Sequence, residues 1–182
     1  DLIKYLKSLE ATKSIFLVTN GQEPEMIQRL ADENALPTQL YLSTNASDYD
    51  SFLKINRPRY DDSWERWNKT LEMLAELDTR TVLRVTLIKN WNDSDEMISG
   101  FKSIFEKSNV HFIEIKSYMH IGRSTNRLEY DNMVEMSDVR KFAHQIAEKS
   151  DRFEVMDESE ISRIVVLQNK KRFTERYLTA YA

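Results

Sequence analysis

The sequence contains no cysteine among its 182 residues. This excludes disulfide bonds, a thiolate nucleophile and any iron–sulfur cluster held by the chain itself, because cluster irons are bound by cysteine thiolates. The three histidines, His111, His120 and His144, are not at the spacing of a zinc site. We therefore expect no metal ligands in this chain.

Long apolar runs and an excess of positive charge are also lacking. No run approaches the roughly 20 residues that a membrane span needs, so insertion in a bilayer is not expected. The first ten residues are charged and show no small-residue cleavage site, so we expect no signal peptide. The net charge of −4 argues against general polyanion binding, although a local basic face remains open. The length and the 41% hydrophobic content predict one domain, residues 1–182, with a substantial core.

Short apolar runs alternate with amphipathic segments along the chain. The runs predict strands, and the segments with helical spacing predict helices. This alternation favours βαβ units, and therefore an α/β fold with a mostly parallel sheet and outer helices. Strands are expected at residues 15–18, 39–43, 80–92, 112–115 and 163–167. Helices are expected at 1–9, from Pro24, at 48–55, from Asp62 or Ser63 to Leu74, at 95–106 and at 139–147, the last with Ser137 as its N-cap.

The segment 80–92, RTVLRVTLIKNWN, is the stretch on which the interpretation of the sequence depends most. Its apolar run alternates little, as expected for a strand that is covered on both faces, although Arg84 and Thr86 interrupt one side. Polar residues from Lys89 to Asn92 follow, and the ends of parallel strands are where binding sites collect. A capped strand end, with Asn92 or Ser94 starting the next helix, is the simpler interpretation, and spacing alone favours it.

Polar clusters follow four of the predicted strands, at 19–21, 43–45, 89–92 and 116–123. Each alone is typical of a turn, but in a parallel sheet all four lie on one rim, which favours a site for a polar ligand. The pair Glu114 and Lys116 points the same way and could meet that ligand or each other. No phosphate loop, Ser/His/Asp arrangement or H-E-x-x-H pair names the ligand.

Several segments resemble one enzyme family, in the same order along the chain. They are residues 16–22 (FLVTNGQ), 37–43 (PTQLYLS), 56–58 (NRP), 80–89 (RTVLRVTLIK), 91–92 (WN), 112–120 (FIEIKSYMH) and 127–128 (RL). In these segments the sequence is similar to the radical S-adenosylmethionine enzymes that form the wyosine base on tRNA, the 4-demethylwyosine synthase family in its archaeal form. The resemblance covers nearly the whole chain.

The resemblance implies both a fold and a reaction. The fold is the carboxyl-terminal portion of a partial (β/α)6 TIM-like barrel, with a region for wyosine base formation from about residue 110 to 182. The reaction condenses pyruvate with N1-methylguanosine next to the anticodon of tRNA(Phe), as a carbon–carbon lyase of the cytoplasm. The full-length family member uses S-adenosylmethionine and a [4Fe–4S] cluster.

The resemblance also implies roles for individual residues. On the substrate side these are Lys89, Asn92, Lys116 and Tyr118; for S-adenosylmethionine they are Thr19, Asn20, Ser43 and Arg84; for tRNA they are Arg57, Arg59, Arg123 and Arg127. From spacing alone, solvated surface charge is the more frequent explanation of such arginines.

The sequence departs from the family in several ways. The cysteine loop for the radical cluster and the first two barrel strands are missing, so we expect the chain without that amino-terminal half to be inactive. Asn45 stands where aspartate is common, and Val134 follows Met133 where proline is usual. Two other functions stay open: a non-catalytic RNA- or partner-binding domain of the same fold, and an unrelated barrel enzyme for a small phosphorylated metabolite. The missing phosphate loop disfavours the second.

Overall fold

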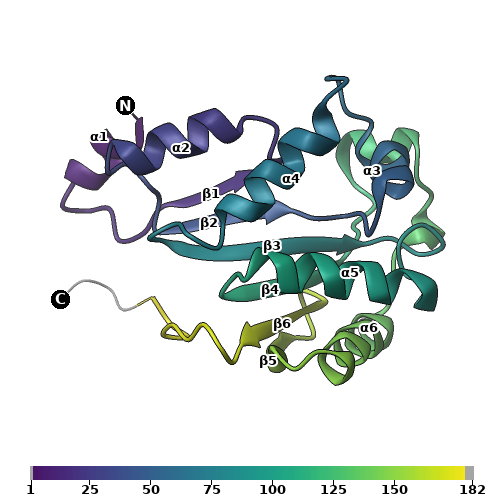
Figure 1. Ribbon diagram of the computed structural model, residues 1–182. Helices are drawn as coiled ribbons and strands as arrows, with labels where there is room; N and C mark the ends of the chain where they lie inside the picture. The colour runs from purple at the N-terminus through teal and green to yellow at the C-terminus, as the bar shows by residue number, and fades with distance from the viewer. Residues whose placement is uncertain (1, 179–182) are drawn as a thin grey trace.

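The computed structural model describes residues 2–178 and contains one six-stranded sheet with the strand order β1-β2-β3-β4-β6-β5. The first four strands are parallel, and β6 and β5 complete the sheet as antiparallel neighbours of β4. Figure 1 shows the four parallel strands with their arrowheads toward the same end of the molecule. The predicted α/β fold with a mostly parallel sheet is therefore confirmed.

The elements follow one another in the order that the sequence pattern predicts, with one additional strand. Their bounds are α1 Leu2–Ser8, β1 Phe16–Thr19, α2 Pro24–Asp32, β2 Gln39–Ser43, α3 Tyr49–Asn56, α4 Ser63–Met73, β3 Arg80–Leu87, α5 Asp95–Ser108, β4 Phe112–Ser117, the 3-10 helices η1 Gly122–Asn126 and η2 Tyr130–Asn132, α6 Met136–Lys149, β5 Phe153–Ser159 and β6 Ile164–Asn169.

The additional strand, β5, is absent from the sequence-based expectation. No strand is predicted between the helix at 139–147 and the strand at 163–167, but Asp157 and Glu158 pair with β6 across a register shift after Val155. The strand lies at the edge of the sheet, where its polar side chains remain exposed, so it has no clear alternation of apolar and polar residues. Residues 2–178 form an open sheet with β1 and β5 as its two edges, not a closed barrel.

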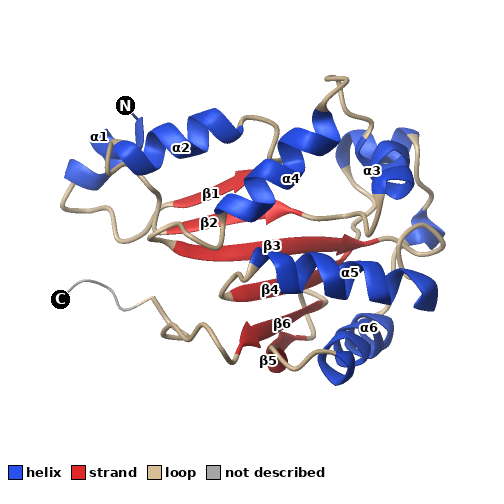
Figure 2. Ribbon diagram, in the orientation of Figure 1, coloured by secondary structure: helices blue, strands red, loops and turns tan. Residues whose placement is uncertain are grey.

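The two faces of the sheet differ, which corrects the expectation that β3 is covered on both. Leu83 and Val85 point to the main core, which packs against α2, α4, α5 and α6 on one side of the sheet (Figure 2). The opposite face carries the partly exposed Arg84 and Thr86. On this second face only a small cluster around Val82 is buried. Burial therefore follows the two-residue period of a strand that is covered by helices on one face.

Several helix termini differ from the prediction. Asp48, predicted as the first residue of its helix, is the N-cap of α3, with its carboxylate accepting from the backbone N–H of Ser51 at 2.8 Å. In contrast, α6 begins three residues earlier than predicted and is capped by Glu135, so that Ser137 lies inside the helix. The side chain of Asp62 forms an ion pair with Arg66 one turn later and does not cap α4. The helix α1 is present, but none of its described residues is buried; the predicted first residue of that helix, Asp1, lies outside the described residues.

The segment after β6 returns to the amino-terminal ends of the parallel strands. There the guanidinium group of Arg172 donates to the backbone carbonyls of Leu74 and Asn109, both at 2.9 Å, and of Leu77 at 3.2 Å. Leu74 and Asn109 are the C-cap residues of α4 and α5. Arg172 thus satisfies carbonyl groups that helix ends leave unpaired, and it joins two helices to the end of the chain. Among the described helices, none is long and apolar enough to cross a membrane.

Candidate functional site

The carboxyl ends of the four parallel strands meet at one rim, at the end of the molecule where Figure 1 shows α3 and the segment around η1 and η2. The polar clusters after β1, β2, β3 and β4 all lie at this rim, as the strand order predicts. Two cavities open at it. We call them the β1–β2 cavity and the β4 cavity, after the strands that supply their first lining residues.

The β1–β2 cavity has a volume of about 310 Å³ and combines polar and apolar walls. The amide Oε1 atom of Gln22 is buried and has no hydrogen-bond partner among the described residues, whereas its Nε2 donates to the carbonyl of Ser63 at 3.1 Å. A buried acceptor without a partner costs free energy, so this atom is suited to a ligand donor. The lining residues are Asn20, Gln22, Ser43, Asn45, Phe52, Ile55, Asn56 and Pro58.

Two of the residues expected to bind the cofactor, Asn20 and Ser43, line this cavity, whereas Thr19 does not. The hydroxyl of Thr19 accepts from the backbone N–H of Gly21 at 3.1 Å and so holds the turn after β1. Gly21 has φ +75°, and a Cβ atom there would lie 2.7 Å from Leu42 Cδ1. The turn that brings Asn20 to the cavity therefore requires glycine.

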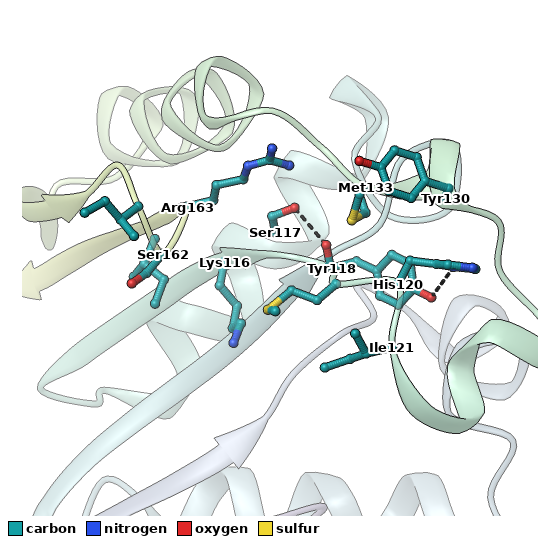
Figure 3. Close-up of a pocket in the computed structure, with 12 residues that line it drawn as sticks. Lys116, Ser117, Tyr118, His120, Ile121, Tyr130, Met133, Ser162 and Arg163 are labelled. Carbon is teal, nitrogen blue, oxygen red and sulfur yellow. Dashed lines mark hydrogen bonds between the residues drawn. The ribbon is translucent and has the colours of Figure 1, made fainter.

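The β4 cavity is larger, about 670 Å³, and lies between the end of β4 and the turn that joins β5 to β6 (Figure 3). Two residues expected on the substrate side, Lys116 and Tyr118, line it. Tyr118 is only 4% exposed, and its hydroxyl contacts His120 Nδ1 at 3.2 Å and Ser124 Oγ at 3.1 Å. Lys116 is half-buried at the end of β4, which gives this cavity a cation beside a fixed phenol.

Asn92 does not point at a ligand, and the expectation that it would is wrong. Its side chain is fully buried, its Oδ1 accepts from the N–H of Ile88 at 2.6 Å, and its Nδ2 donates to the carbonyls of Asn45 and Thr86 at 2.9 Å each. These three bonds join the loop after β2 to the end of β3. Asn92 is neither a ligand contact nor the N-cap of α5, which is Ser94, but a link that fixes the rim.

Lys89 lies at the rim and is exposed, as expected, but it lines neither cavity. Its backbone N–H donates to the carbonyl of Asn132 at 2.9 Å, and its own carbonyl accepts from Asn132 Nδ2 at 3.0 Å. These two bonds tie η2 to the end of β3. The backbone position of Lys89 is therefore fixed, while its side chain remains accessible.

Arg84 lies on the open face of the sheet and lines neither rim cavity. Its Nε donates to the carboxylate of Glu114 at 2.7 Å, and its guanidinium lies 5.0 Å from the centre of the Tyr41 ring. Arg84 and Glu114 are direct neighbours in the β3–β4 register. The sequence left open whether Glu114 pairs with Lys116 or meets a ligand. In the structure Glu114 pairs with Arg84 on the neighbouring strand.

The four arginines expected to contact tRNA have different environments. Arg59 and Arg123 are exposed. Arg57 is also exposed, and its left-handed backbone, with φ 47°, ends α3. Arg127 is half-buried and donates to the carbonyl of Ile55 at 3.1 Å, which joins the loop after η1 to the end of α3. Arg127 therefore has a structural contact, while the other three leave their charges toward solvent.

Most of the lining residues were not among the expected site residues, and three of these matter most for the site: Gln22, Tyr130 and Arg163. Gln22 directly follows the polar turn after β1, so its position was a usable signal. Tyr130 and Arg163 reach the β4 cavity from η2 and from the β5–β6 turn. Neither segment has a sequence pattern that places it beside β4, because that placement depends on the antiparallel return of the chain.

The two cofactors implied by the resemblance fit the chain differently. The β1–β2 cavity offers amides, a hydroxyl and the unpaired Oε1 of Gln22 beside apolar side chains. This combination suits a ligand such as S-adenosylmethionine, which has amino and hydroxyl groups that form hydrogen bonds and an adenine ring that packs on apolar side chains. A [4Fe–4S] cluster does not fit, because the chain has no cysteine and residues 2–178 contain no group of three His, Cys, Asp or Glu that could hold a metal.

Comparison with known proteins identifies the carboxyl-terminal part of this fold. The family model described as wyosine base formation matches residues 107–169, from the end of α5 to the end of β6. The matched residues make up less than half of the chain. They contribute β4 and much of the β4 cavity, including Tyr118, Tyr130 and Arg163.

Curated relatives extend the similarity toward the amino terminus. The chain is 39% identical over 152 residues to the S-adenosyl-L-methionine-dependent tRNA 4-demethylwyosine synthase of Pyrococcus abyssi, covering 84% of this chain and 44% of that protein. It is 39% identical over 157 residues to the enzyme of that name from Methanocaldococcus jannaschii, covering 86% and 47%. The chain thus spans about half the length of the curated relatives it matches first, and the resemblance stated from the sequence is confirmed.

Solved structures show the same fold. A structure of TYW1 with a lysine-pyruvate adduct bound superposes with a TM-score of 0.79 at 37% identity, covering 94% of this chain and 51% of that one. A crystal structure of archaeal TYW1 superposes with a TM-score of 0.73 at 34% identity and equal coverage. This chain therefore shares its α/β architecture with both structures.

The two departures from the family pattern leave the local geometry intact. The Oδ1 atom of Asn45 accepts from the N–H of Thr86 at 2.9 Å, a bond that an aspartate oxygen would also make. Met133 has φ −69° and ψ 139°, the extended backbone that a residue before proline favours. Val134 therefore occupies the position of the usual proline without a change of backbone conformation.

Proposed function

We propose that this chain forms the carboxyl-terminal part of an enzyme that modifies tRNA, a 4-demethylwyosine synthase. The observation that supports the proposal most strongly is the 39% identity to the Pyrococcus abyssi enzyme over 84% of the chain. The reaction in this proposal condenses pyruvate with N1-methylguanosine next to the anticodon of tRNA(Phe), which is carbon–carbon lyase chemistry in the cytoplasm. The pyruvate assignment is supported by the lysine-pyruvate adduct in the related TYW1 structure.

The β1–β2 cavity is the S-adenosylmethionine site in this proposal. Asn20 and Ser43 hold the polar ends of the ligand, and the unpaired Oε1 of Gln22 accepts from one of its amino groups. Apolar contacts come from Phe52 and Ile55. Arg84 pairs with Glu114 on the open face of the sheet and does not line the cavity, so the proposed site does not include it. Bound S-adenosylmethionine supplies the radical chemistry of the family.

The β4 cavity and the neighbouring rim are the substrate side. Lys116 provides a cation for an anionic group of the substrate, and the hydroxyl of Tyr118 is held in place by His120 and Ser124. Lys89 approaches the substrate from the exposed end of β3, and Arg57, Arg59 and Arg123 provide charges for the tRNA backbone. The remaining amino-terminal half of the barrel and the [4Fe–4S] ligands belong to the rest of the enzyme in this proposal, and the 182 residues act as one domain within it.

Product formation tests the proposal directly. The intact protein that contains this chain is reconstituted anaerobically with iron and sulfide and incubated with S-adenosylmethionine, pyruvate and tRNA(Phe) that carries N1-methylguanosine. We expect 5′-deoxyadenosine and a new tricyclic nucleoside after digestion of the tRNA, both detected by mass spectrometry. The 182-residue chain alone is expected to give neither product and no cluster absorbance. An intact protein that gives neither product contradicts the proposal.

Lys89→Ala in the intact protein tests the substrate side of the rim. We expect a strong loss of tRNA conversion with a nearly unchanged melting temperature, because substitutions of exposed side chains usually change stability by only about 0.5 kcal/mol. Arg59→Ala is the comparison: it should weaken tRNA binding and flatten its salt dependence while sparing the uncoupled cleavage of S-adenosylmethionine. Full activity of Lys89→Ala would remove Lys89 from the site.

A non-catalytic RNA- or partner-binding domain is the second candidate function. The lack of cysteine in all 182 residues favours it, because this chain supplies no thiolate for a cluster. In the same assay this candidate predicts that the intact protein binds tRNA but forms no 5′-deoxyadenosine.

A further inference from the structure

The β4 cavity has a local charge opposite in sign to that of the chain. Lys116 and Arg163 are among its twelve lining residues, and none of the twelve is acidic (Figure 3). The whole sequence, in contrast, has 30 acidic residues and a net charge of −4. A cavity that lacks carboxylates in an acidic protein is suited to an anionic ligand.

The two cations are not equivalent. The guanidinium of Arg163 is already engaged, since it pairs with Glu135 at 3.2 Å and donates to the carbonyl of Val134 at 3.2 Å. Lys116, which comes from the opposite side of the cavity, makes no hydrogen bond with the other residues drawn in Figure 3. Lys116 is half-buried as a residue, and an anionic partner in the cavity would be favourable for its charge. Lys116 is therefore the cation available to the ligand.

Aromatic side chains form the other side of the cavity. The rings of Tyr118 and His120 meet edge to face with centroids 6.2 Å apart, and the ring of His120 meets that of Tyr130 in the same way at 6.2 Å. Tyr118 is buried, whereas Tyr130 is 68% exposed. The three rings thus lead from the buried Tyr118 to the exposed Tyr130. The exposed ring of Tyr130 is suited to stacking on a planar group.

The position of Tyr130 is fixed by its own short helix. Asn132 accepts from the N–H of Glu129 at 2.8 Å and also bonds to the backbone of Lys89, so that η2 is attached to the end of β3. Apolar side chains complete the cavity entrance, with Met119 52% exposed and Ile121 63% exposed. The volume of about 670 Å³ is within the range of roughly 300–1,000 Å³ that is typical of cavities for small ligands and cofactors.

We propose that the β4 cavity binds one unstacked nucleotide of an RNA strand, with its base stacked on Tyr130 and its phosphate beside Lys116. This assignment rests on the proposed function, which makes RNA the substrate, and it adds the residues that take up the nucleotide. The argument for RNA is the combination of features: an accessible aromatic ring, an available cation, apolar walls and no carboxylate. Together they match the aromatic and basic surfaces that bind single-stranded nucleic acid.

The test uses the intact protein and a stem-loop RNA with the anticodon-arm sequence of tRNA(Phe), with 2-aminopurine at the nucleotide next to the anticodon. Stacking on Tyr130 is expected to quench the 2-aminopurine fluorescence on binding. Tyr130→Ala should abolish this quenching and weaken binding roughly tenfold, whereas Tyr130→Phe, which keeps the ring, should preserve both. Lys116→Gln should weaken binding and lower the slope of log Kd against log salt by about one.

Matched controls separate this role from general surface effects. Tyr177 is 69% exposed, nearly as much as Tyr130, and it lies in the segment after β6, outside the cavity; Lys141 is exposed on α6. Tyr177→Ala and Lys141→Gln should leave quenching and the salt slope unchanged. Circular dichroism spectra and melting temperatures of all variants should match those of the unsubstituted protein.

Several results would overturn the proposal. If Tyr130→Ala and Tyr177→Ala bind and quench alike while tRNA conversion by the unsubstituted protein is intact, the proposed function stands and the nucleotide site is wrong. If the unsubstituted protein binds no RNA and modifies none, both fail. If Tyr130→Ala alters the oligomeric state and leaves RNA binding unchanged, the cavity is a protein interface and the assignment is again wrong.

Discussion

At the scale of single residues, the rim is fixed by polar side chains that serve the fold. Asn92 is the clearest example, because its amide bonds to three backbone groups of the ends of β2 and β3. From spacing alone this residue was interpreted as part of a capped strand end, whereas the family resemblance placed it on the substrate side. A polar residue after a strand therefore has two roles that the sequence does not distinguish, and only the burial of its side chain decides between them.

Asn92→Ala should destabilise the protein strongly. The substitution leaves the N–H of Ile88 and the carbonyls of Asn45 and Thr86 without their partner, and an unsatisfied buried polar group costs about 1–3 kcal/mol. We expect a loss of about 2–3 kcal/mol in the free energy of unfolding, measured by urea titration. Lys89→Ala, three residues earlier but exposed, is the control and should change this value by less than about 0.5 kcal/mol. Equal effects of the two substitutions would contradict the structural role of Asn92.

The candidate site could be predicted from the sequence only in part. The polar clusters at 19–21 and 43–45 were placed on one rim because parallel strands end together, and Asn20 and Ser43 do share a cavity. The roles of Arg84 and Arg127 could not be foreseen, because each depends on one partner across the fold, Glu114 and the carbonyl of Ile55. Sequence spacing reports which face a side chain lies on but not which group it meets.

At the scale of elements, β3 and β4 are joined beyond their regular pairing by His111. The backbone N–H of Thr81 donates to the ring atom Nδ1 of His111 at 3.1 Å, and the backbone N–H of His111 donates to the carbonyl of Thr81 at 3.2 Å. Burial, with the charges of Arg172 and Arg80 as further causes, lowers the pKa of His111 to about 4. The imidazole therefore stays neutral and accepts the Thr81 N–H near neutral pH.

This arrangement predicts a loss of stability in mild acid. The unfolded chain binds a proton on this histidine near its ordinary pKa of 6.5, whereas the folded protein does so only near 4. Between these values the unfolded state holds more protons, so the free energy of unfolding falls as the pH falls from about 6.5 to about 4. Melting temperatures measured across this window should decline less steeply for His111→Asn. The control is His144→Asn on the exposed side of α6, and a slope unchanged by His111→Asn would refute the argument.

The pattern of elements shows where sequence prediction succeeds and why it stops. The bounds of β2 were predicted without error because Gln39–Ser43 lies between clear turn signals, and the period of α3 agrees with its buried Phe52 and Ile55. The strand β5 was missed because only its first residue, Phe153, is fully buried, while Asp157 and Glu158 at its other end are charged and exposed. The register shift after Val155 also interrupts the alternation of apolar and polar residues that would indicate a strand.

At the scale of the whole molecule, the two sheet edges are unlike. The β5 edge carries Asp157 and Glu158 and a register shift, features that discourage pairing with another strand. The β1 edge has none of these features, and its side chains Phe16 and Val18 are 54% and 49% exposed. The unpaired backbone of β1 is therefore the edge at which a further strand would add.

The 182-residue chain on its own should self-associate through β1. Light scattering at increasing concentration is expected to show oligomers, and Val18→Lys should suppress them because a lysine on an edge strand opposes pairing. Leu53→Lys, which places the same charge on a 41% exposed leucine of α3, should not. A chain that remains monomeric at high concentration would argue against a missing neighbouring strand and, with it, against the barrel.

The hydrogen bonds from Arg172 to the ends of α4 and α5 have a consequence for synthesis on the ribosome. Its bonds to the carbonyls of Leu74 and Leu77 span 98 and 95 residues. At about 5–20 residues per second, a ribosome needs several seconds or more to synthesise that length of chain. Throughout this interval α4 has emerged while the carbonyls at its end lack their final partner. The contacts between Arg172 and the ends of α4 and α5 therefore form only after residue 172 has left the exit tunnel. A chain stopped before that residue lacks these contacts and would be a preferred substrate for chaperones and proteases.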